Sequence, residues 1–287
     1  MEKLKKILLV LIVVALIAAI AGVTTNFVLS KVSKKSNPIV TMEVEGYGTI
    51  KIELYPDMAP NTVKNFIKLA QRGYYNGKTF SDVAEGLVQG GFDEVAEDSE
   101  EVAGPKLSNI RDLAEGEEDE PYSIVGEFIE NGYNDNTLSH ERGVISMYRT
   151  TYTQYEQEIA MVQMMGYSDY LNTILENMYD SQGSGFFIVT EDSTEFDGTY
   201  TAFGKVIEGM DVVDTISKLE VETTTDEDGN ETTSTKLVTA PVISNVSVDT
   251  FGVDYGEPET IDVFDFDAIF NIFMQNYMQS SSTTTTY

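Results

Sequence analysis

Apolar and polar positions beyond residue 38 alternate in a way that predicts a domain built mainly from short strands. Residues 39–55 read as two strands around a turn in which Gly46 and Gly48 are the hairpin residues. Seven further strand-like runs follow, namely TFSDVA, LVQGGF, SIVGEFI, GVISMY, GFFIV, TAFGKVI and PVISNVSVDTF. Many short strands with few helices are typical of an antiparallel barrel or sandwich.

Two segments of the same region carry the helical period instead. The segment APNTVKNFIKLAQRGYYNG has Pro60 in a favourable first-turn position and Gly73 as a stop signal. Its apolar stripe comprises Val63, Phe66, Ile67 and Leu69 or Ala70. A second, shorter helix is predicted at GMDVVDTISKL, between the last two strands.

Three insertions interrupt the strand pattern, at residues 94–120, 151–180 and 222–235. The first is acidic and loop-like, and the third is a polar excursion. The second is predicted to be helical, since apolar residues recur at helical spacing at Ile159, Val162, Met165, Tyr170, Ile174 and Met178. We favour a helical hairpin packed on the domain over a partner-binding face, because apolar helical stripes are usually buried.

Both ends of the chain differ from this central part. Residues 255–287 predict a short helix with apolar residues at Phe266, Ile269, Phe270 and Phe273, followed by a disordered tail. At the other end, residues 7–23 contain no polar side chain, and no charged residue lies between Lys6 and Lys31.

This apolar run predicts a membrane anchor in residues 1–30, with contact to the membrane through residues 7–29 and a linker over residues 31–38. A cleaved signal peptide is the alternative, because Ala19-Ile20-Ala21 has the small-residue spacing of cleavage sites. A short basic N-terminus before an apolar run is typical of export signals. We therefore expect a single-pass protein of the cell membrane whose domain is extracytoplasmic.

Composition narrows the chemistry. The net charge of −30 over 287 residues argues against nucleic acid as a partner. Cysteine is absent and His140 is the one histidine, so a thiolate nucleophile is excluded and neither a Ser-His-Asp triad nor a histidine-rich metal site is expected. The acidic run at residues 226–228 is interpreted as a solvated loop, since it lacks the twelve-residue ligand loop of an EF-hand.

Three blocks of sequence resemble the bacterial cyclophilin-type peptidyl-prolyl cis-trans isomerases. They are VEGYGTIKIELYPDMAPNTVKNFIKLAQRGYYNGKTF, GEFIENGYNDNTLSHERGVISM and GSGFFIVTEDSTEFDGTYTAFGKVIEGMDVVDTI, in the order and approximate spacing of that family. The resemblance covers most of residues 39–254. It implies a mainly β fold, an eight-stranded antiparallel barrel capped by two helices. It also implies a groove for X-Pro peptides and catalysis without a cofactor or a metal.

Carried over residue by residue, the resemblance implies that Phe187 is the floor of the proline pocket. The other residues that it places in the groove are Gln89, Leu87, Phe196, Tyr200 and Tyr148. His140 matches a structural histidine of the family and is not expected to be catalytic. Tyr148 replaces a small alanine, and its ring is expected either to narrow the pocket or to turn toward the insertion at residues 151–180.

The departures fall on the catalytic strand. Ser81 and Asp82 occupy the family's histidine and catalytic arginine positions, and the strand is one residue short. An ionised carboxylate accepts hydrogen bonds and cannot donate them, so Asp82 cannot do the work of the arginine. Arg149 is the nearest substitute but is expected to be a solvated or salt-bridged surface residue. Gly185 and Glu195 replace a glutamine and an aromatic residue or histidine.

Two main functions follow from this pattern. The first is a peptidyl-prolyl isomerase that assists the folding of exported proteins, weakly because of Asp82. The second is a module that binds proline-containing segments of unfolded or exported proteins without catalysis, as a chaperone or scaffold on the cell surface. A third hypothesis makes the helices of residues 151–180 and the C-terminal helix the working interface, with the β domain as a platform.

Overall fold

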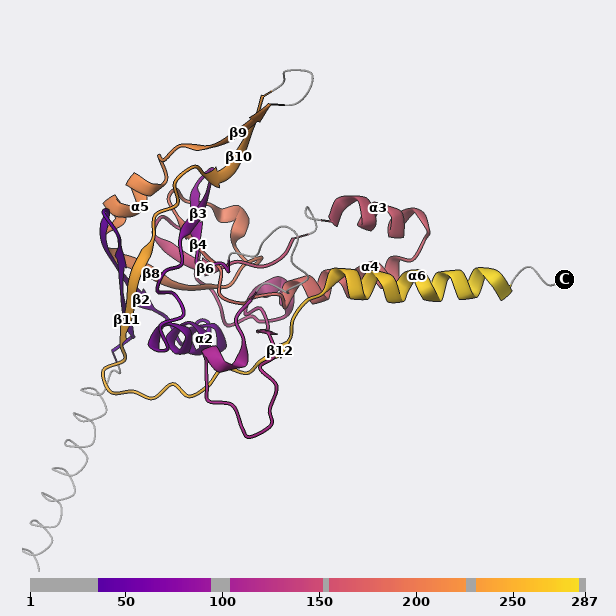
Figure 1. Ribbon diagram of the computed structural model, residues 1–287, viewed down its shortest axis with the longest axis horizontal. Coiled ribbons are helices and arrows are strands. Elements are labelled where there is room, and N and C mark those ends of the chain that lie inside the picture. The colour runs from indigo at the N-terminus through magenta and orange to yellow at the C-terminus, as the bar shows by residue number, and fades with distance from the viewer. Residues whose placement is uncertain (1–35, 94–103, 152–154, 226–230, 284–287) are drawn as a thin grey trace, which may run out of the picture. The chain divides into compact units, whose positions relative to one another are not determined.

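The computed structural model describes residues 36–93, 104–151, 155–225 and 231–283, and most of its strands form one large antiparallel sheet (Figure 1). Among these residues the sheet has ten strands in the order β11-β1-β2-β8-β6-β7-β4-β3-β10-β9. In chain order they are β1 (Ile39–Val44), β2 (Gly48–Leu54), β3 (Phe80–Ala84), β4 (Leu87–Gly90), β6 (Val144–Met147), β7 (Phe186–Val189), β8 (Ala202–Glu208), β9 (Val221–Thr225), β10 (Glu231–Leu237) and β11 (Ile243–Asp249).

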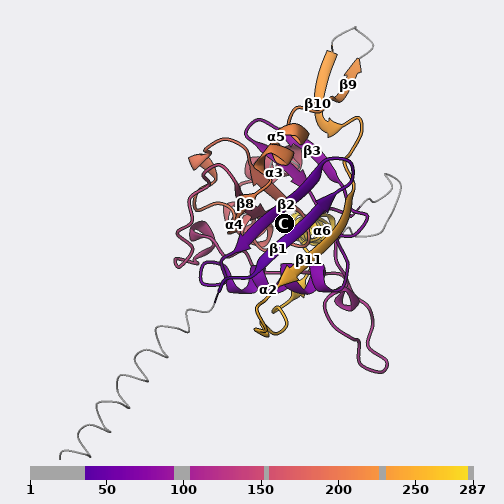
Figure 2. The same ribbon diagram turned by 90° about the vertical axis from the view of Figure 1, so that its left-hand side faces the viewer.

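Two helices pack on this sheet and close its main core. The first is α2 (Pro60–Gln71), which contacts β11, and the second is α5 (Met210–Ile216), which contacts β2. The apolar stripe predicted for the first helix is buried, and Gly73 adopts the positive φ of +73° that ends the helix, as the sequence indicates. Figure 2 shows β11, β1 and β2 side by side, as their pairing requires.

The prediction of a strand at SIVGEFI is largely wrong. It contains only the end of β5 (Tyr122–Ser123), which pairs with β12 (Ile261–Asp262). The chain then leaves the extended path because Glu127 turns toward α2, where its carboxylate accepts the backbone N–H groups of Asn61 at 2.9 Å and Thr62 at 2.8 Å. A carboxylate at this place satisfies two free donors of the first helical turn and complements the helix dipole.

The strands do not form the predicted eight-stranded barrel. The sheet is open, with β11 at one end and β9 at the other. Residues 222–235, predicted as a polar excursion, contribute the β9–β10 hairpin, which lengthens the sheet by pairing on β3 through Lys236 and Asp82. An isolated bridge between Thr79 and Val242 joins the approach to β3 with the approach to β11. Backbone N–H groups of Gly77, Phe80 and Ile243 donate to the carbonyls of Ile243, Pro241 and Lys78 beside this bridge.

The insertion at residues 151–180 is helical, as predicted, and forms α3 (Glu156–Met164) and α4 (Ser168–Tyr179). These helices share a separate apolar core with α6 (Phe266–Thr283), the C-terminal helix (Figure 1). Its buried members are Ile159, Ile174, Met178 and Phe266. The C-terminal helix is longer than predicted and includes residues assigned from the sequence to the disordered tail. The apolar stripe of the insertion is therefore buried largely by a segment more than 80 residues later in the chain.

The predicted membrane anchor and linker, residues 1–30 and 31–38, lie almost wholly outside the described residues. Within residues 36–283, as far as they are described, no helix is both long enough and apolar enough to cross a membrane. The anchor therefore stays a prediction.

Candidate functional site

The site is built on neighbouring strands of the sheet. Asp82 of β3 pairs with Gln89 of β4, Gln89 pairs with Phe187 of β7, and Phe187 pairs with Ser146 of β6. Residues directly opposite each other in antiparallel strands carry their side chains on the same face of the sheet. The position predicted to lack the catalytic arginine is thus in the same row as the predicted pocket floor and the predicted glutamine.

Three rings lie together at this face and form what we call the aromatic cluster: Phe187, Phe196 and Tyr200. Their centroids are 5.6 Å apart for Phe187 and Phe196, 5.3 Å for Phe187 and Tyr200, and 5.5 Å for Phe196 and Tyr200. All three contacts are edge-to-face, the favoured geometry for aromatic pairs. Leu87 belongs to the same apolar group.

Exposure differs among these rings. Phe187 is only 2% exposed, whereas Phe196 and Tyr200 are partly exposed and form the accessible part of the cluster. A peptide that approaches this face therefore meets Phe196 and Tyr200 before it reaches the ring predicted to be the floor.

Tyr148 makes a ring contact that the sequence did not indicate. Its ring packs edge-to-face on Phe92, with centroids 4.9 Å apart. The same Phe92 ring explains Gly185, because a Cβ at that position would come within 2.4 Å of Phe92 Cε1. The loss of the family's glutamine at residue 185 thus makes room for Phe92, against which Tyr148 packs.

Asp82 is held at the border between the sheet and the β9–β10 hairpin. Thr235 Oγ1 donates a hydrogen bond to Asp82 Oδ1 at 3.1 Å. The neighbouring Ser81 Oγ is buried and makes no hydrogen bond within the described part of the chain. At the two positions where the family carries histidine and arginine, the structure therefore offers the substrate no cation.

Arg149 is not the solvated surface residue that we predicted. It is 8% exposed, and its guanidinium carbon lies 4.8, 5.0 and 5.4 Å from the ring centroids of Tyr200, Tyr179 and Phe128. Its Nε donates to the Thr199 carbonyl at 2.8 Å and its Nη1 to the Thr150 carbonyl at 3.1 Å. Cation–π contacts of this kind favour arginine and fix the side chain.

Sequence reasoning missed the surroundings of Arg149. The three rings come from residues far apart in the chain, and one of them, Tyr179, belongs to the helical insertion. One signal in the sequence indicated that Arg149 packs against a ring. It is an arginine directly after a buried strand, and the family resemblance places it close to Tyr200.

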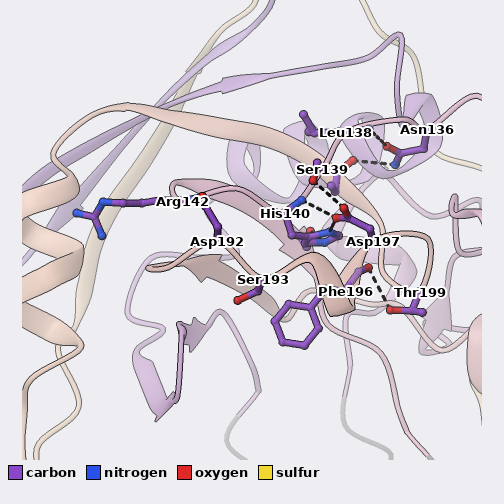
Figure 3. Close-up of polar contacts among 12 residues, drawn as sticks. Asn136, Leu138, Ser139, His140, Arg142, Asp192, Ser193, Phe196, Asp197 and Thr199 are labelled. Atoms are coloured by element: carbon purple, nitrogen blue, oxygen red, sulfur yellow. Dashed lines mark hydrogen bonds and ion pairs between the residues drawn. The ribbon is translucent and has the colours of Figure 1, made fainter.

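His140 is the buried centre of a polar network (Figure 3). Its Nδ1 lies 2.9 Å from Asp197 Oδ1, and its Nε2 lies 2.8 Å from Ser146 Oγ. Asp197 also accepts the His140 backbone N–H at 2.7 Å and the Ser139 hydroxyl at 2.6 Å. The order Ser146, His140, Asp197 looks like a hydrolase triad, yet Ser146 and His140 are almost fully buried. No substrate can reach this hydroxyl, and the network is structural, in agreement with the prediction for His140.

The network predicts a specific pH dependence of stability. Burial lowers the pKa of His140 below its ordinary 6.5, although the hydrogen bond and the charge of Asp197 oppose this shift. The unfolded chain therefore takes up this proton at higher pH than the folded chain does. The stability that neutral His140 contributes is complete above about pH 6.5 and is lost as the pH falls through the folded pKa.

Urea denaturation between about pH 7.5 and 5.5 measures this effect, with His140→Gln as the comparison because it cannot titrate. We expect the unaltered chain to lose stability over this interval more steeply than the variant. Asp197 does not account for the difference, since its pKa is lowered from 3.8 by hydrogen bonds from Ser139 and His140 that outweigh its burial. Parallel curves for the two proteins would contradict the assignment.

No group of three or more histidine, aspartate or glutamate side chains in the described ranges is placed to hold a metal ion. What the arrangement offers is an apolar aromatic surface, an amide at Gln89 and a carboxylate at Asp82 in one row of the sheet. These groups can bind an apolar ring beside a peptide bond.

Comparison with known proteins gives several relatives of one kind. Peptidyl-prolyl cis-trans isomerase B of Bacillus subtilis (strain 168) is 30% identical to this chain over 179 residues, which are 62% of this chain and 90% of that protein. Peptidyl-prolyl cis-trans isomerase-like 2 of Rhizopus delemar is 28% identical over 198 residues, 68% of this chain but only 27% of that longer protein.

Among solved structures, the chain is similar to a Cryptosporidium parvum cyclophilin type peptidyl-prolyl cis-trans isomerase crystallised in the presence of the dipeptide Ala-Pro. The identity is 20%, the TM-score is 0.48, and the match covers 74% of this chain and 98% of that one. The family model described as "Cyclophilin type peptidyl-prolyl cis-trans isomerase/CLD" matches residues 39–163 and 170–242. Because this match spans well over half of the residues of the chain, the chain belongs to the cyclophilin-type peptidyl-prolyl cis-trans isomerase family.

Proposed function

We propose that the protein binds proline-containing segments of exported proteins at the aromatic cluster and catalyses their cis/trans isomerisation weakly. The observation that carries this proposal is the row of Asp82, Gln89 and Phe187 on one face of the sheet. In this row the ring of Phe187, the proposed floor for proline, lies beside the amide of Gln89. The carboxylate of Asp82 stands where the family has its catalytic cation.

The chemistry explains why binding and catalysis separate here. Rotation about an X-Pro bond meets a barrier of about 18–20 kcal/mol because the C–N bond has partial double-bond character. A protein lowers this barrier when it binds the twisted amide better than the planar one. An apolar ring surface binds proline equally well in the planar and the twisted state. A donor placed at the twisted amide binds the twisted state better. Asp82 supplies no such donor when ionised.

A purely binding role is the second candidate. It is favoured by Asp82 together with the burial of Phe187, which leaves Phe196 and Tyr200 as the accessible rings. Such a protein would hold proline-containing segments as a chaperone or scaffold without accelerating their rotation.

The cellular setting belongs to the same proposal. The apolar run at residues 7–23 supports attachment to the cell membrane, with the domain outside the cytoplasm, where exported chains fold. The net charge of −30 supports protein segments rather than nucleic acid as partners.

Peptide binding tests the proposal directly. We expect a short Ala-Pro peptide to shift the NMR signals of Phe187, Phe196 and Tyr200, and an Ala-Ala peptide of equal length to bind at least about tenfold more weakly. Phe196→Ala is expected to weaken binding of the Ala-Pro peptide because it removes an accessible ring. Equal binding of the two peptides, or shifts confined to α3 and α6, would refute a proline site at the aromatic cluster.

A further inference from the structure

A cavity of about 540 Å³ lies between the helical insertion and the turn that precedes β8, and we call it the α4 cavity. One wall consists of Leu175, Met178 and Tyr179 of α4. The other side has three parts. The turn before β8 contributes Glu195, Phe196, Thr199 and Tyr200, the segment after β6 contributes Arg149 and Thr151, and the short 3-10 helix Ile129–Asn131 contributes Glu130.

Two rings belong both to this cavity and to the aromatic cluster, namely Phe196 and Tyr200. Their centroids lie 5.6 and 5.3 Å from that of Phe187. An extended peptide advances about 3.3–3.6 Å per residue. A proline bound at the cluster and a side chain in the α4 cavity are therefore separated by about one ring width, which corresponds to one or two residues of peptide.

The lining decides which side chain fits. Leu175, Met178 and the rings of Phe196, Tyr179 and Tyr200 make most of the wall apolar. Arg149 donates through Nε and Nη1 to backbone carbonyls, while Nη2 has no hydrogen-bond partner in the described part of the chain. Arg149 lines the cavity, and the carbonyl of a bound peptide is a suitable acceptor for that nitrogen. The cavity thus suits a bulky apolar side chain whose backbone can accept a hydrogen bond.

Charge at the cavity favours a particular sequence context. The lining includes the carboxylates of Glu130 and Glu195, and both residues are exposed. Exposed carboxylates attract a cationic ligand over a Debye length of about 8 Å at physiological salt. The net charge of −30 acts in the same direction.

We propose that the α4 cavity is a specificity site for the client peptide, which takes a large apolar side chain within two residues of the bound proline and favours lysine or arginine beside it. The inference rests on the proposed function, since it assigns a subsite next to the same proline. It gives the helical insertion a role in selecting the peptide.

The test uses the full chain and peptides that contain one Ala-Pro unit, with alanine or leucine placed one or two residues to either side and with lysine or serine at the ends. We expect leucine in at least one position to tighten binding about fivefold or more, and lysine ends to bind better than serine ends at low salt only. Leu175→Glu is expected to abolish the preference for leucine while the alanine peptide still binds. Ile272→Glu, at a 59% exposed position of α6, is the control and is expected to keep the preference.

A charge pair completes the test. Glu195→Lys is expected to abolish the preference for lysine ends, whereas Glu191→Lys, an exposed residue of the same loop outside the cavity, makes the same change in net charge and is expected to keep it. Peptide binding without any preference for leucine overturns the α4 cavity as a subsite but leaves the proline site standing. Loss of binding for every proline peptide, by contrast, refutes the proposed function itself.

Discussion

Asp82→Arg is expected to raise the rate of prolyl isomerisation by about tenfold or more. The change replaces an acceptor-only carboxylate with a planar donor in the same cross-strand row as Gln89 and Phe187. A donor aimed at the twisted amide stabilises the transition state more than the ground state, and only such differential binding accelerates the reaction.

The gain is expected to be smaller than the 10²–10³-fold that a fully preorganised donor typically supplies. The strand was one residue short of the family pattern, and β3 and β4 show an irregular register between Phe80 and Asp82. An arginine at residue 82 would also stand opposite Lys236 of β10, and like charges in that relation cost roughly 0.2–1 kcal/mol. Both effects limit the precision with which the new side chain is held.

Phe187→Ala is expected to lower the free energy of unfolding by about 3–5 kcal/mol. The Phe187 ring is 2% exposed and makes edge-to-face contacts with Phe196 and Tyr200, as well as stacking on His140. Removing it leaves a cavity in an apolar group whose other buried members come from four strands of the sheet, so the surroundings collapse onto it only in part: Leu87, Val144, Val189 and Ala202. The same variant is expected to lose its affinity for proline peptides, since the ring also shapes the cluster.

Urea denaturation at neutral pH measures this loss, and Phe187→Leu serves as the comparison because it keeps most of the apolar volume. We expect the leucine variant to lose clearly less stability than the alanine variant. An alanine variant that is destabilised by less than about 1 kcal/mol would mean that Phe187 is not the buried centre of the cluster.

The local elements of the sheet were predictable because period and turn signals are local. Gly46 and Gly48 marked the first hairpin, and Pro60 and Gly73 marked the ends of α2. The positions of Phe187, Phe196 and Tyr200 came from the family resemblance, which carries long-range pairing that no single segment contains. The structure brings these three rings together, while their role in binding peptide stays a prediction.

What escaped prediction depended on contacts between distant segments. The run ETTTDEDGNETTST has no apolar residue, so nothing in its pattern indicates that it contributes two strands, the second of which pairs on β3 through the next residue, Lys236. The same holds for Arg149, which is buried by Tyr179 from the insertion and Phe128 from another loop. Glu127 interrupts an apolar run because its carboxylate is needed at the start of α2, more than 60 residues earlier.

The most direct test of this account measures cis/trans exchange of one Ala-Pro peptide by NMR in the presence of three proteins: the unaltered chain, Asp82→Arg and Glu85→Arg. Glu85 is an exposed residue of the turn after β3, so its substitution changes the net charge equally without adding a donor to the site. We predict weak acceleration by the unaltered chain and by Glu85→Arg, and an increase of about tenfold for Asp82→Arg. An Asp82→Arg rate no higher than that of the unaltered chain, with peptide binding intact, would contradict the placement of the catalytic position at residue 82.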